Sequence, residues 1–317
     1  MKLTTLIPAY KPRYLVELFT GLIHQSRRPD RIIVSDDSPR GTYSAMLRSD
    51  TIGPLLSELP LEIVQGPRRG SSYANVRHLL KAWGGDGDLV HLLFDDDLLY
   101  PDFYERHLIA HRSGNFTCSV SRRWTALESG QPVARPQVPP ELTTHPNRLI
   151  AVGPDLIYPT TIPFCRNWLG EFSNAVMRAD MHEVLERAEL NGLSYEGLED
   201  IGMFLAASER GTVCFVNEAL GAFRHGPEQN TSQLLAPVMM KAHLAWVALA
   251  IAARRSGRLD GPQARDGIAH LQSLVDRRYR DEGRMDEFRR LVAGLVDGRD
   301  GAEEAFLTVW QQFVSAH

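Results

Sequence analysis

The first 97 residues alternate between apolar, β-branched segments and segments with helical spacing, and this alternation limits the fold more than any other feature. The strand-like segments are residues 2–10, 30–38, 61–67 and 88–97. The helix-like segments lie between them, at residues 13–26, 41–59 and 71–85. A β-α-β-α-β-α-β order predicts a mostly parallel, Rossmann-like α/β sheet with helices on both faces.

The pattern changes beyond residue 112. Further strand-like segments are expected at 115–127, at the start of 171–185, and as a pair of strands in 212–226, with a helix over 194–211. Residues 129–165 have little periodicity and are expected to form a long loop region. From about residue 235 the chain has amphipathic helical stripes broken by glycine. We therefore expect an α/β domain over residues 1–232 and an all-helical extension over residues 233–317.

Composition excludes several classes of protein. The net charge is −4 and no basic stripe with interleaved aromatic residues occurs, so nucleic acid is not an expected partner. The three cysteines are far apart, which argues against a disulfide framework and a zinc site. No apolar run reaches the ~20 residues of a membrane span, and the N-terminal apolar stretch is too short for a secretory signal. We expect a soluble, cytoplasmic protein.

The basic residues also carry information about the source of the gene. Only four of the 35 lysine and arginine residues are lysines: Lys2, Lys11, Lys81 and Lys241. Such a strong preference for arginine is typical of a GC-rich bacterial gene.

Runs of aspartate follow two of the predicted strands. In an extended strand Asp95 and Asp97 would point to one side and Asp96 to the other, and two carboxylates on one side are a hard oxygen site for Mg²⁺ or Mn²⁺. The alternative is a solvated turn that caps the next helix. Asp36 and Asp37 lie at the end of the second strand, where a carboxylate can accept a hydrogen bond from a base or a ribose, or cap a helix. Nucleotides bind such sheets at the carboxyl ends of the strands.

Seven short motifs occur in a fixed order across residues 1 to about 232. They lie in the segments TLIPAYKP, HQSRRPDRIIVSDDS, GSSYANVRHLL, LLFDDDLLYPDF, LGEFSNAVMR, GLEDIGMFL and AFRHGPEQNTS. In order and spacing this part of the chain resembles the inverting family 2 glycosyltransferases of the GT-A fold, which use nucleotide-sugar donors. Lys11 and His78 stand where the family has asparagine, and the helical extension lies outside the resemblance.

The resemblance implies roles for the matching residues. Asp97 would bind the divalent metal directly, Asp95 would lie near the ribose and the metal's waters with Asp96, and His225 would be a second metal or phosphate contact. Asp200 would be the general base. The nucleotide would be bound by Pro8, Ala9, Tyr10, Asp36, Asp37, Arg77, Asp95 and Asp96. The acceptor region would include Trp168, Gly170, Glu171 and Glu199.

Each role has a plainer alternative. Glu199 and Asp200 also suit the first turn of a helix, where acids are favoured by the helix dipole. Arg77 also suits a solvated helix face, and His225 a turn. Trp168 is either a core residue or an aromatic platform for a sugar.

Inverting glycosyl transfer needs the types of residue that the sequence supplies. A nucleotide-sugar donor reacts by displacement at its anomeric carbon, with an oxocarbenium-like transition state. The leaving diphosphate needs a divalent cation or basic groups, and the acceptor hydroxyl needs a carboxylate as base. Asp97 and Asp200 meet these two needs from different elements.

Two other functions remain open. A nucleotidyltransferase shares a similar nucleotide-binding half, but the segment IPAYKPRY lacks its glycine-rich loop. A non-catalytic nucleotide-sugar-binding protein is the third hypothesis, and the intact Asp95, Asp97 and Asp200 argue against it.

The donor and the acceptor are less defined. A UDP-sugar is the expected donor, with dTDP- and GDP-sugars as alternatives. The acceptor is expected to be a small molecule, a saccharide or a lipid-linked molecule. The C-terminal helices are expected to pack on the first domain, to form a homodimer surface or to recognise the acceptor.

Overall fold

A computed structural model of the chain describes residues 1–226 and 235–316. The alternation predicted for the N-terminal part is present. Its strands and helices are β1 (Leu3–Ala9), α1 (Leu15–Ile23), β2 (Arg31–Asp36), α2 (Thr42–Leu47), β3 (Leu61–Gln65), α3 (Ser72–Trp83) and β4 (Leu89–Leu92). Within the helix-like segment 41–59, α2 is followed by a separate short 3-10 helix, Gly53–Leu56, which contains Gly53-Pro54.

The middle of the chain completes the sheet. Its elements are β5 (Leu98–Leu99), α4 (Phe103–Ser113), β6 (Cys118–Ala126), β7 (Pro132–Ala134), α5 (Pro140–Thr143), β8 (Leu149–Val152), α6 (Pro154–Thr161), β9 (Ala175–Arg178), α7 (His182–Arg187), β10 (Glu189–Leu190), β11 (Leu193–Ser194), α8 (Glu199–Arg210) and β12 (Val213–Arg224). Two sequence expectations were wrong. Residues 129–165 contain strands and helices, and residues 212–226 contain one long strand whose register shifts against β6 let it bend without ending.

The described residues form a 10-stranded sheet in the order β3-β2-β1-β4-β9-β6-β12-β5, with β7 on β6 and β8 on β12. Strand β1 is parallel to β2 and β4, and β2 is parallel to β3. Strand β9 is antiparallel to both of its neighbours, β4 and β6. The carboxyl ends of β1, β2 and β4 therefore meet at one edge of the sheet, which is where the two aspartate runs begin.

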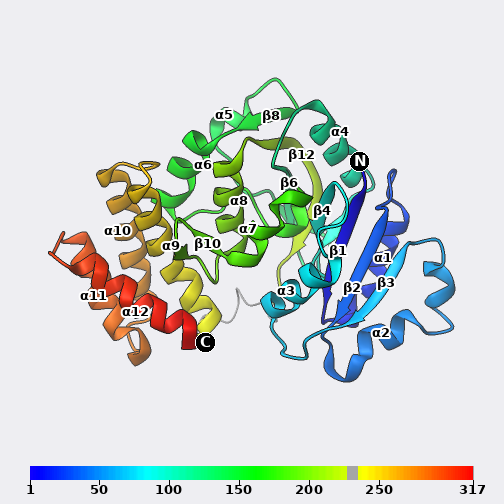
Figure 1. Ribbon diagram of the computed structural model, residues 1–317, viewed down its shortest axis with the longest axis horizontal. Helices are drawn as coiled ribbons and strands as arrows, with labels where there is room; N and C mark the ends of the chain where they lie inside the picture. The colour runs from blue at the N-terminus through cyan, green and yellow to red at the C-terminus, as the bar shows by residue number, and fades with distance from the viewer. Residues whose placement is uncertain (227–234, 317) are drawn as a thin grey trace. The chain divides into compact units, whose positions relative to one another are not determined.

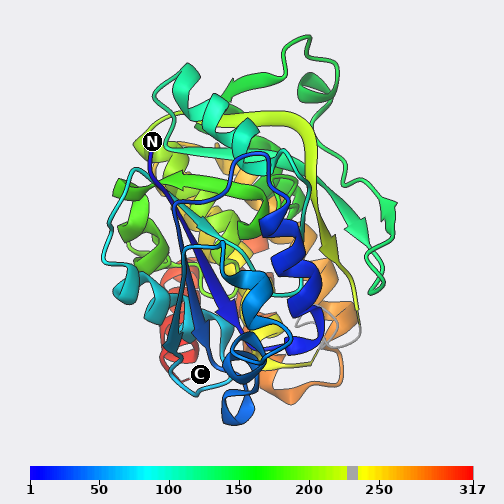
Figure 2. The same ribbon diagram turned by 90° about the vertical axis from the view of Figure 1, so that its right-hand side faces the viewer.

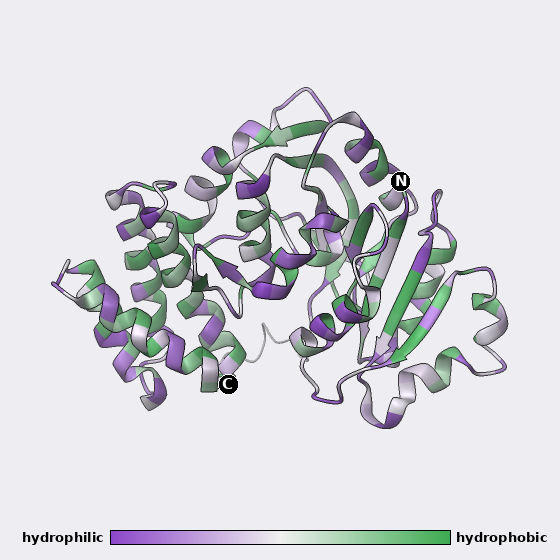
Figure 3. Ribbon diagram, viewed as in Figure 1, coloured by the Kyte–Doolittle hydropathy of each residue, from purple (hydrophilic) through white to green (hydrophobic). Residues whose placement is uncertain are grey.

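Both faces of the first strands are covered. Every residue of β1 is buried, which matches a strand between two layers of helices. Figures 1 and 2 show α1 and α3 on opposite faces of the sheet. The middle of β2 is hydrophobic and its ends are hydrophilic, as Figure 3 shows. The core against α1 is built on its buried side chains Leu15, Leu18, Phe19 and Leu22.

The chain divides into two compact units. The first unit consists of residues 1–151, 169–186 and 210–225, and the second of residues 152–168, 187–209 and 226–317. The second unit contains the C-terminal helices α9 (Pro237–Arg255), α10 (Gly261–Arg278), α11 (Asp286–Val296) and α12 (Ala302–Ala316). Helix α9 is buried all round from Met240 to Ala253. The domain boundary expected between residues 232 and 233 lies outside the described residues and stays a prediction.

Two of the exclusions made from composition can be compared with the structure. The three cysteines are free thiols, and Cys118 and Cys214 are buried. Among the helices of the described residues, none combines the length and the apolarity that crossing a membrane requires.

Candidate functional site

The three aspartates after β4 lie in a tight turn and not in a strand. Strand β4 ends at Leu92, and the amide of Asp97 bonds back to the carbonyl of Phe94 at 3.3 Å. The argument from strand alternation was therefore wrong, because a turn does not place alternate residues on one face. The three carboxyl groups instead take three different sets of partners.

Asp95 is buried and holds the end of β1. Its Oδ2 accepts hydrogen bonds from the backbone amides of Tyr10 and Lys11, each at 2.6 Å. Burial and the neighbouring charge of Asp96 raise the pKa of Asp95 to about 7, although the two amides act to lower it. The segment after β1 and the turn after β4 are thus fixed to each other by one carboxyl group.

Asp96 is the most exposed of the three and forms an ion pair with Lys11. The distance from Nζ of Lys11 to Oδ2 of Asp96 is 3.0 Å. Lys11 stands where the resembled family has asparagine, and this contact gives it a local role that the motif did not predict.

Asp97 is the least compensated carboxyl group of the turn. Its side chain is only 4% exposed, and its Oδ1 has no hydrogen-bond partner among the described residues. Burial and the charge of Asp96 raise the pKa of Asp97 well above its ordinary value, while a hydrogen bond with Ser173 acts to lower it. A buried carboxylate that lacks a partner costs about 1–3 kcal/mol or more, so this oxygen is a place where a cation would be stabilised.

Ser173 belongs to a short 3-10 helix, Phe172–Asn174, whose position is set by several contacts. The Oγ of Ser173 accepts from the amide of Phe94 at 3.0 Å, and its carbonyl contacts Nε2 of His91 at 3.1 Å. Ser173 lies in the motif segment LGEFSNAVMR, but it was given no role, because the sequence does not show that this segment lies beside the turn after β4.

The donor set fits a divalent cation that shares its ligands with a substrate. Asp97 has one unused buried oxygen, and no described residue donates to Oδ1 of Asp95. Mg²⁺ commonly takes one or two protein carboxylates and completes its shell with water and phosphate oxygens. Across residues 1–226 and 235–316 no group of three or more metal-ligating side chains is gathered, so His225 is not brought together with the two aspartates.

The aspartates at the end of β2, Asp36 and Asp37, are arranged differently. Asp36 accepts from the amides of Ser38 at 2.9 Å and Ser44 at 2.8 Å. Asp37 accepts from the amides of Arg68 and of Gly70, the latter at 2.9 Å. Both carboxylates therefore hold turns of the chain, and the role of either in nucleotide binding stays a prediction.

The hydrogen bonds to Asp36 also affect its pKa. Burial acts to raise the pKa of this carboxyl, but hydrogen bonds from Ser38 and Ser44 outweigh burial and lower it. The first turn of α2 is held by Asp36 together with Ser38, whose Oγ accepts from the amide of Tyr43 at 2.9 Å.

The other predicted nucleotide contacts differ in exposure. Pro8 and Ala9 are the last residues of β1 and are buried, whereas Tyr10 is 44% exposed. Arg77 is exposed on α3, with its guanidinium stacked 4.4 Å from the ring of Tyr73. Of these four residues, Tyr10 and Arg77 have exposed side chains, and the role of all four in nucleotide binding stays a prediction.

The predicted acceptor residues fall in both units. Gly170 and Glu171 belong to the first, where Glu171 pairs with Arg123 at 3.2 Å and Gly170 has a φ of +117°. A Cβ at Gly170 would clash with the side chains of Arg123 and Asn174, so only glycine fits there. These contacts explain why a glycine and a glutamate occur at these two positions without any role in binding an acceptor.

Asp200 and Glu199 open α8 in the second unit. The Nδ2 of Asn167 donates to Oδ2 of Asp200 at 2.7 Å. Glu199 accepts from the amide of Gly197 at 2.9 Å, and burial raises its pKa. Asn167 was missed from the sequence, since an asparagine contact across 33 residues leaves no local pattern.

Trp168 is a buried residue of the second unit. It is 3% exposed, and its indole N–H donates to the hydroxyl of Thr160 at 2.9 Å. This is the environment that the core-packing alternative predicts.

Comparisons with known proteins show which solved structures share this fold. No family model matches the chain, and no curated protein matches it either. Solved structures do match. Residues 1–349 of S. aureus TarS align with a TM-score of 0.54 and 14% identity, covering 100% of this chain and 92% of that one.

Two further TarS structures give the same result with ligands bound. The complex with UDP-GlcNAc aligns with a TM-score of 0.55 at 14% identity, and the complex with UDP with 0.52 at 15%. They cover 100% of this chain and 93% and 92% of the TarS chain. The likeness is one of fold, and it confirms the predicted class, a GT-A-like mostly parallel α/β sheet flanked by helices with a C-terminal helical region.

Proposed function

We propose that the chain is a glycosyltransferase that moves a sugar from a nucleoside diphosphate sugar, a UDP-sugar in the first instance, to an acceptor hydroxyl with inversion. The observation that supports this most is the buried Oδ1 of Asp97, which lacks a partner at the carboxyl end of a parallel strand. The fold is shared with TarS structures that were solved with UDP and UDP-GlcNAc.

In this proposal the turn after β4 binds the diphosphate end of the donor. Asp97, with Asp95, would hold Mg²⁺ or Mn²⁺. His225, which is not gathered with these two carboxylates, would contact a phosphate. A bound divalent cation would supply positive charge that stabilises the leaving diphosphate. Tyr10 and Arg77 are the predicted nucleotide contacts whose side chains are exposed to a ligand.

The reaction is a displacement at the anomeric carbon. The bond from this carbon to the diphosphate oxygen breaks, and the nucleoside diphosphate leaves with the electron pair. The acceptor oxygen bonds to the carbon from the opposite face. The proton of the acceptor hydroxyl passes to the carboxylate of Asp200, whose Oδ2 is oriented by the amide of Asn167.

Calorimetric titration of UDP, with and without Mn²⁺, tests the donor site. We expect binding that depends on Mn²⁺ and that weakens at least about 100-fold in Asp97→Asn, because the amide cannot provide a charged ligand. Asp86→Asn is the matched control, since Asp86 is an exposed aspartate that pairs with Lys2. Binding of UDP that is equally strong in Asp97→Asn would contradict the metal assignment, and metal-independent binding would contradict the cofactor.

Transfer itself is tested with Asp200→Asn. UDP binding should be unchanged, and UDP release from a UDP-sugar in the presence of acceptor should fall about 10²–10⁴-fold, the usual contribution of a general base. Normal turnover would mean that the base is another residue. Release of pyrophosphate from a nucleoside triphosphate would favour the nucleotidyltransferase alternative.

A further inference from the structure

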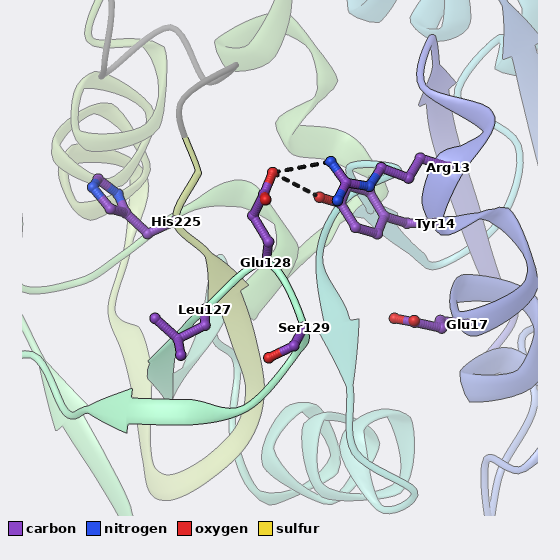
Figure 4. A pocket seen from close by; sticks show the side chains of 7 residues that line it. All are labelled: Arg13, Tyr14, Glu17, Leu127, Glu128, Ser129 and His225. Carbon is purple, nitrogen blue, oxygen red and sulfur yellow. Dashed lines mark hydrogen bonds and ion pairs between the residues drawn. The ribbon is translucent and has the colours of Figure 1, made fainter.

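The first unit contains a cavity of about 660 Å³ that the roles described above do not explain. It is lined by residues of three segments: Arg13, Tyr14, Glu17, Leu127, Glu128, Ser129 and His225. Figure 4 shows Arg13, Tyr14 and Glu17 on one side, Leu127 and His225 on the other, and Glu128 reaching up from the turn between them. The volume is in the range of about 300–1,000 Å³ that is typical of pockets for small ligands.

The charges of the lining are balanced in pairs. Glu128 accepts from Nη1 of Arg13 at 3.1 Å, and Glu17 forms an ion pair with Arg224. Arg224 is only 2% exposed and lies behind the lining, where it also donates to the carbonyl of Glu128 at 2.6 Å. A neutral ligand would leave both pairs intact, whereas a charged ligand would have to compete with one of them, so the pocket suits an uncharged ligand.

Hydrogen-bonding capacity remains in the lining. Both side-chain contacts of Glu128, from Arg13 and from the hydroxyl of Tyr14 at 3.5 Å, go to Oε1, and no described residue donates to Oε2. The Oγ of Ser129 accepts only a long bond of 3.4 Å from the amide of Gln131, so its own proton is available. A carboxylate oxygen and a hydroxyl in one small space are suited to ligand hydroxyl groups.

Leu127 adds an apolar surface to the same pocket. Its side chain is 48% exposed, although it lies beside Glu128 in the chain. A ligand that offers both hydroxyl groups and C–H faces would use both surfaces, as sugars and polyols do.

The pocket is next to the turn that carries the acidic cluster. Lys11, which pairs with Asp96, directly precedes the 3-10 helix Pro12–Tyr14 that provides two lining residues. Burial raises the pKa of the Tyr14 hydroxyl. The charges of Arg13 and Arg224 act to lower it, and those of Glu128 and Asp96 act to raise it.

We propose that this pocket binds a neutral polyhydroxylated group, a sugar or polyol portion of the acceptor, with Glu128 and Ser129 as its hydrogen-bonding contacts and Leu127 as its apolar contact. This inference rests on the proposed function, because it names the acceptor class for the same reaction. An anionic acceptor would bring its charge beside Glu128, and a lipid chain would have to bury the Arg13–Glu128 pair without compensation.

The test is saturation-transfer NMR on the full chain with UDP and Mn²⁺ present. The probes are methyl β-D-glucopyranoside and sorbitol as neutral ligands, and glucose 6-phosphate as the anionic one. We expect the neutral probes to bind, and their affinity to fall at least about 10-fold in Glu128→Gln. The glutamine side chain has only one accepting oxygen, and its charge is lost. Glu141→Gln, which changes another exposed glutamate of the same unit, should leave their binding unchanged.

The outcomes separate the two proposals. Unchanged UDP binding together with weakened neutral probes in Glu128→Gln would support the pocket. Neutral probes that do not bind, that bind equally well to Glu128→Gln, or that bind more weakly than glucose 6-phosphate would overturn it, while UDP binding would still support the donor site. If the wild-type chain did not bind UDP, the proposed function itself would be contradicted. The melting temperature of Glu128→Gln is compared with that of the wild type, and an unchanged value shows that the variant is folded.

Discussion

The aspartate runs at the end of β2 and after β4 look alike in the sequence and differ in how their oxygens are used. Asp36 and Asp37 each accept two backbone amides and hold neighbouring turns in place. Asp95 does the same through one oxygen, but Asp97 keeps a buried oxygen without a partner among the described residues. Both runs sit at the carboxyl ends of parallel strands, so position alone does not separate them.

The difference shows how a structural carboxylate is told from a ligand-binding one. Hydrogen bonds to Asp36 outweigh its burial and lower its pKa, whereas burial dominates at Asp97 and raises its pKa. A carboxylate whose charge is already compensated by the chain stabilises the fold. One whose charge is left uncompensated destabilises the metal-free fold and gains most from a ligand.

The largest effect expected from this comparison is on stability. Asp36→Ala should lower the free energy of unfolding by about 2–4 kcal/mol, because it leaves the amides of Ser38 and Ser44 without their acceptor. Asp97→Ala should leave the metal-free stability unchanged or raise it, since it removes a buried carboxyl with an unpaired oxygen. Urea unfolding of the metal-free variants, followed by circular dichroism, measures both changes.

The contrast between the two variants is the informative quantity. If Asp97→Ala lost as much stability as Asp36→Ala, then Asp97 would be a structural residue and its supposed unpaired oxygen would have a partner. Adding Mn²⁺ and UDP should raise the free energy of unfolding of the wild-type chain and should leave that of Asp97→Ala unchanged.

A smaller effect is expected at Asp37. Its two amide partners lie in the loop of residues 66–70, in which Arg68 has a φ of +55° and Gly70 of +60°. Asp37→Ala should cost about 1–2 kcal/mol, less than Asp36→Ala, because the amides of this partly exposed loop regain water. Hydrogen exchange should speed up at Arg68 and Gly70. Unchanged exchange at these two amides would show that the loop holds its conformation without the carboxylate.

Much of the fold was predictable because its signals are local. The change between strand and helix periodicity marks the elements from β1 to β4, and their order alone implies a parallel sheet. The place of β9 was not predictable, because it comes from beyond residue 170 and inserts between β4 and β6. The end of β4 at Leu92 was also missed, since Leu93 and Phe94 continue its apolar pattern.

The site was predictable in its residue types and not in their partners. The aspartate runs are visible in the sequence, and Asp200 is visible as one of two acids that begin a helix. The groups that decide their roles come from distant segments: the amide of Tyr10 for Asp95, Ser173 for Asp97 and Asn167 for Asp200. Sequence spacing contains no information on these contacts, which arise only when the strands are brought together.

The smallest effect that we expect from the comparison of the two aspartate runs is on the pH dependence of stability. The pKa of Asp36 is lower in the folded chain than its ordinary value of 3.8, so its stabilising contribution is present above that value and is lost as pH falls through the folded pKa. The difference in unfolding free energy between the wild type and Asp36→Asn should therefore shrink as the pH is lowered from about 6 to about 2.5. Asp50→Asn, at an exposed aspartate, is the control and should give a much flatter difference. A difference for Asp36→Asn that grows toward acid pH would reverse the sign and show that burial, as at Asp97, dominates after β2 as well.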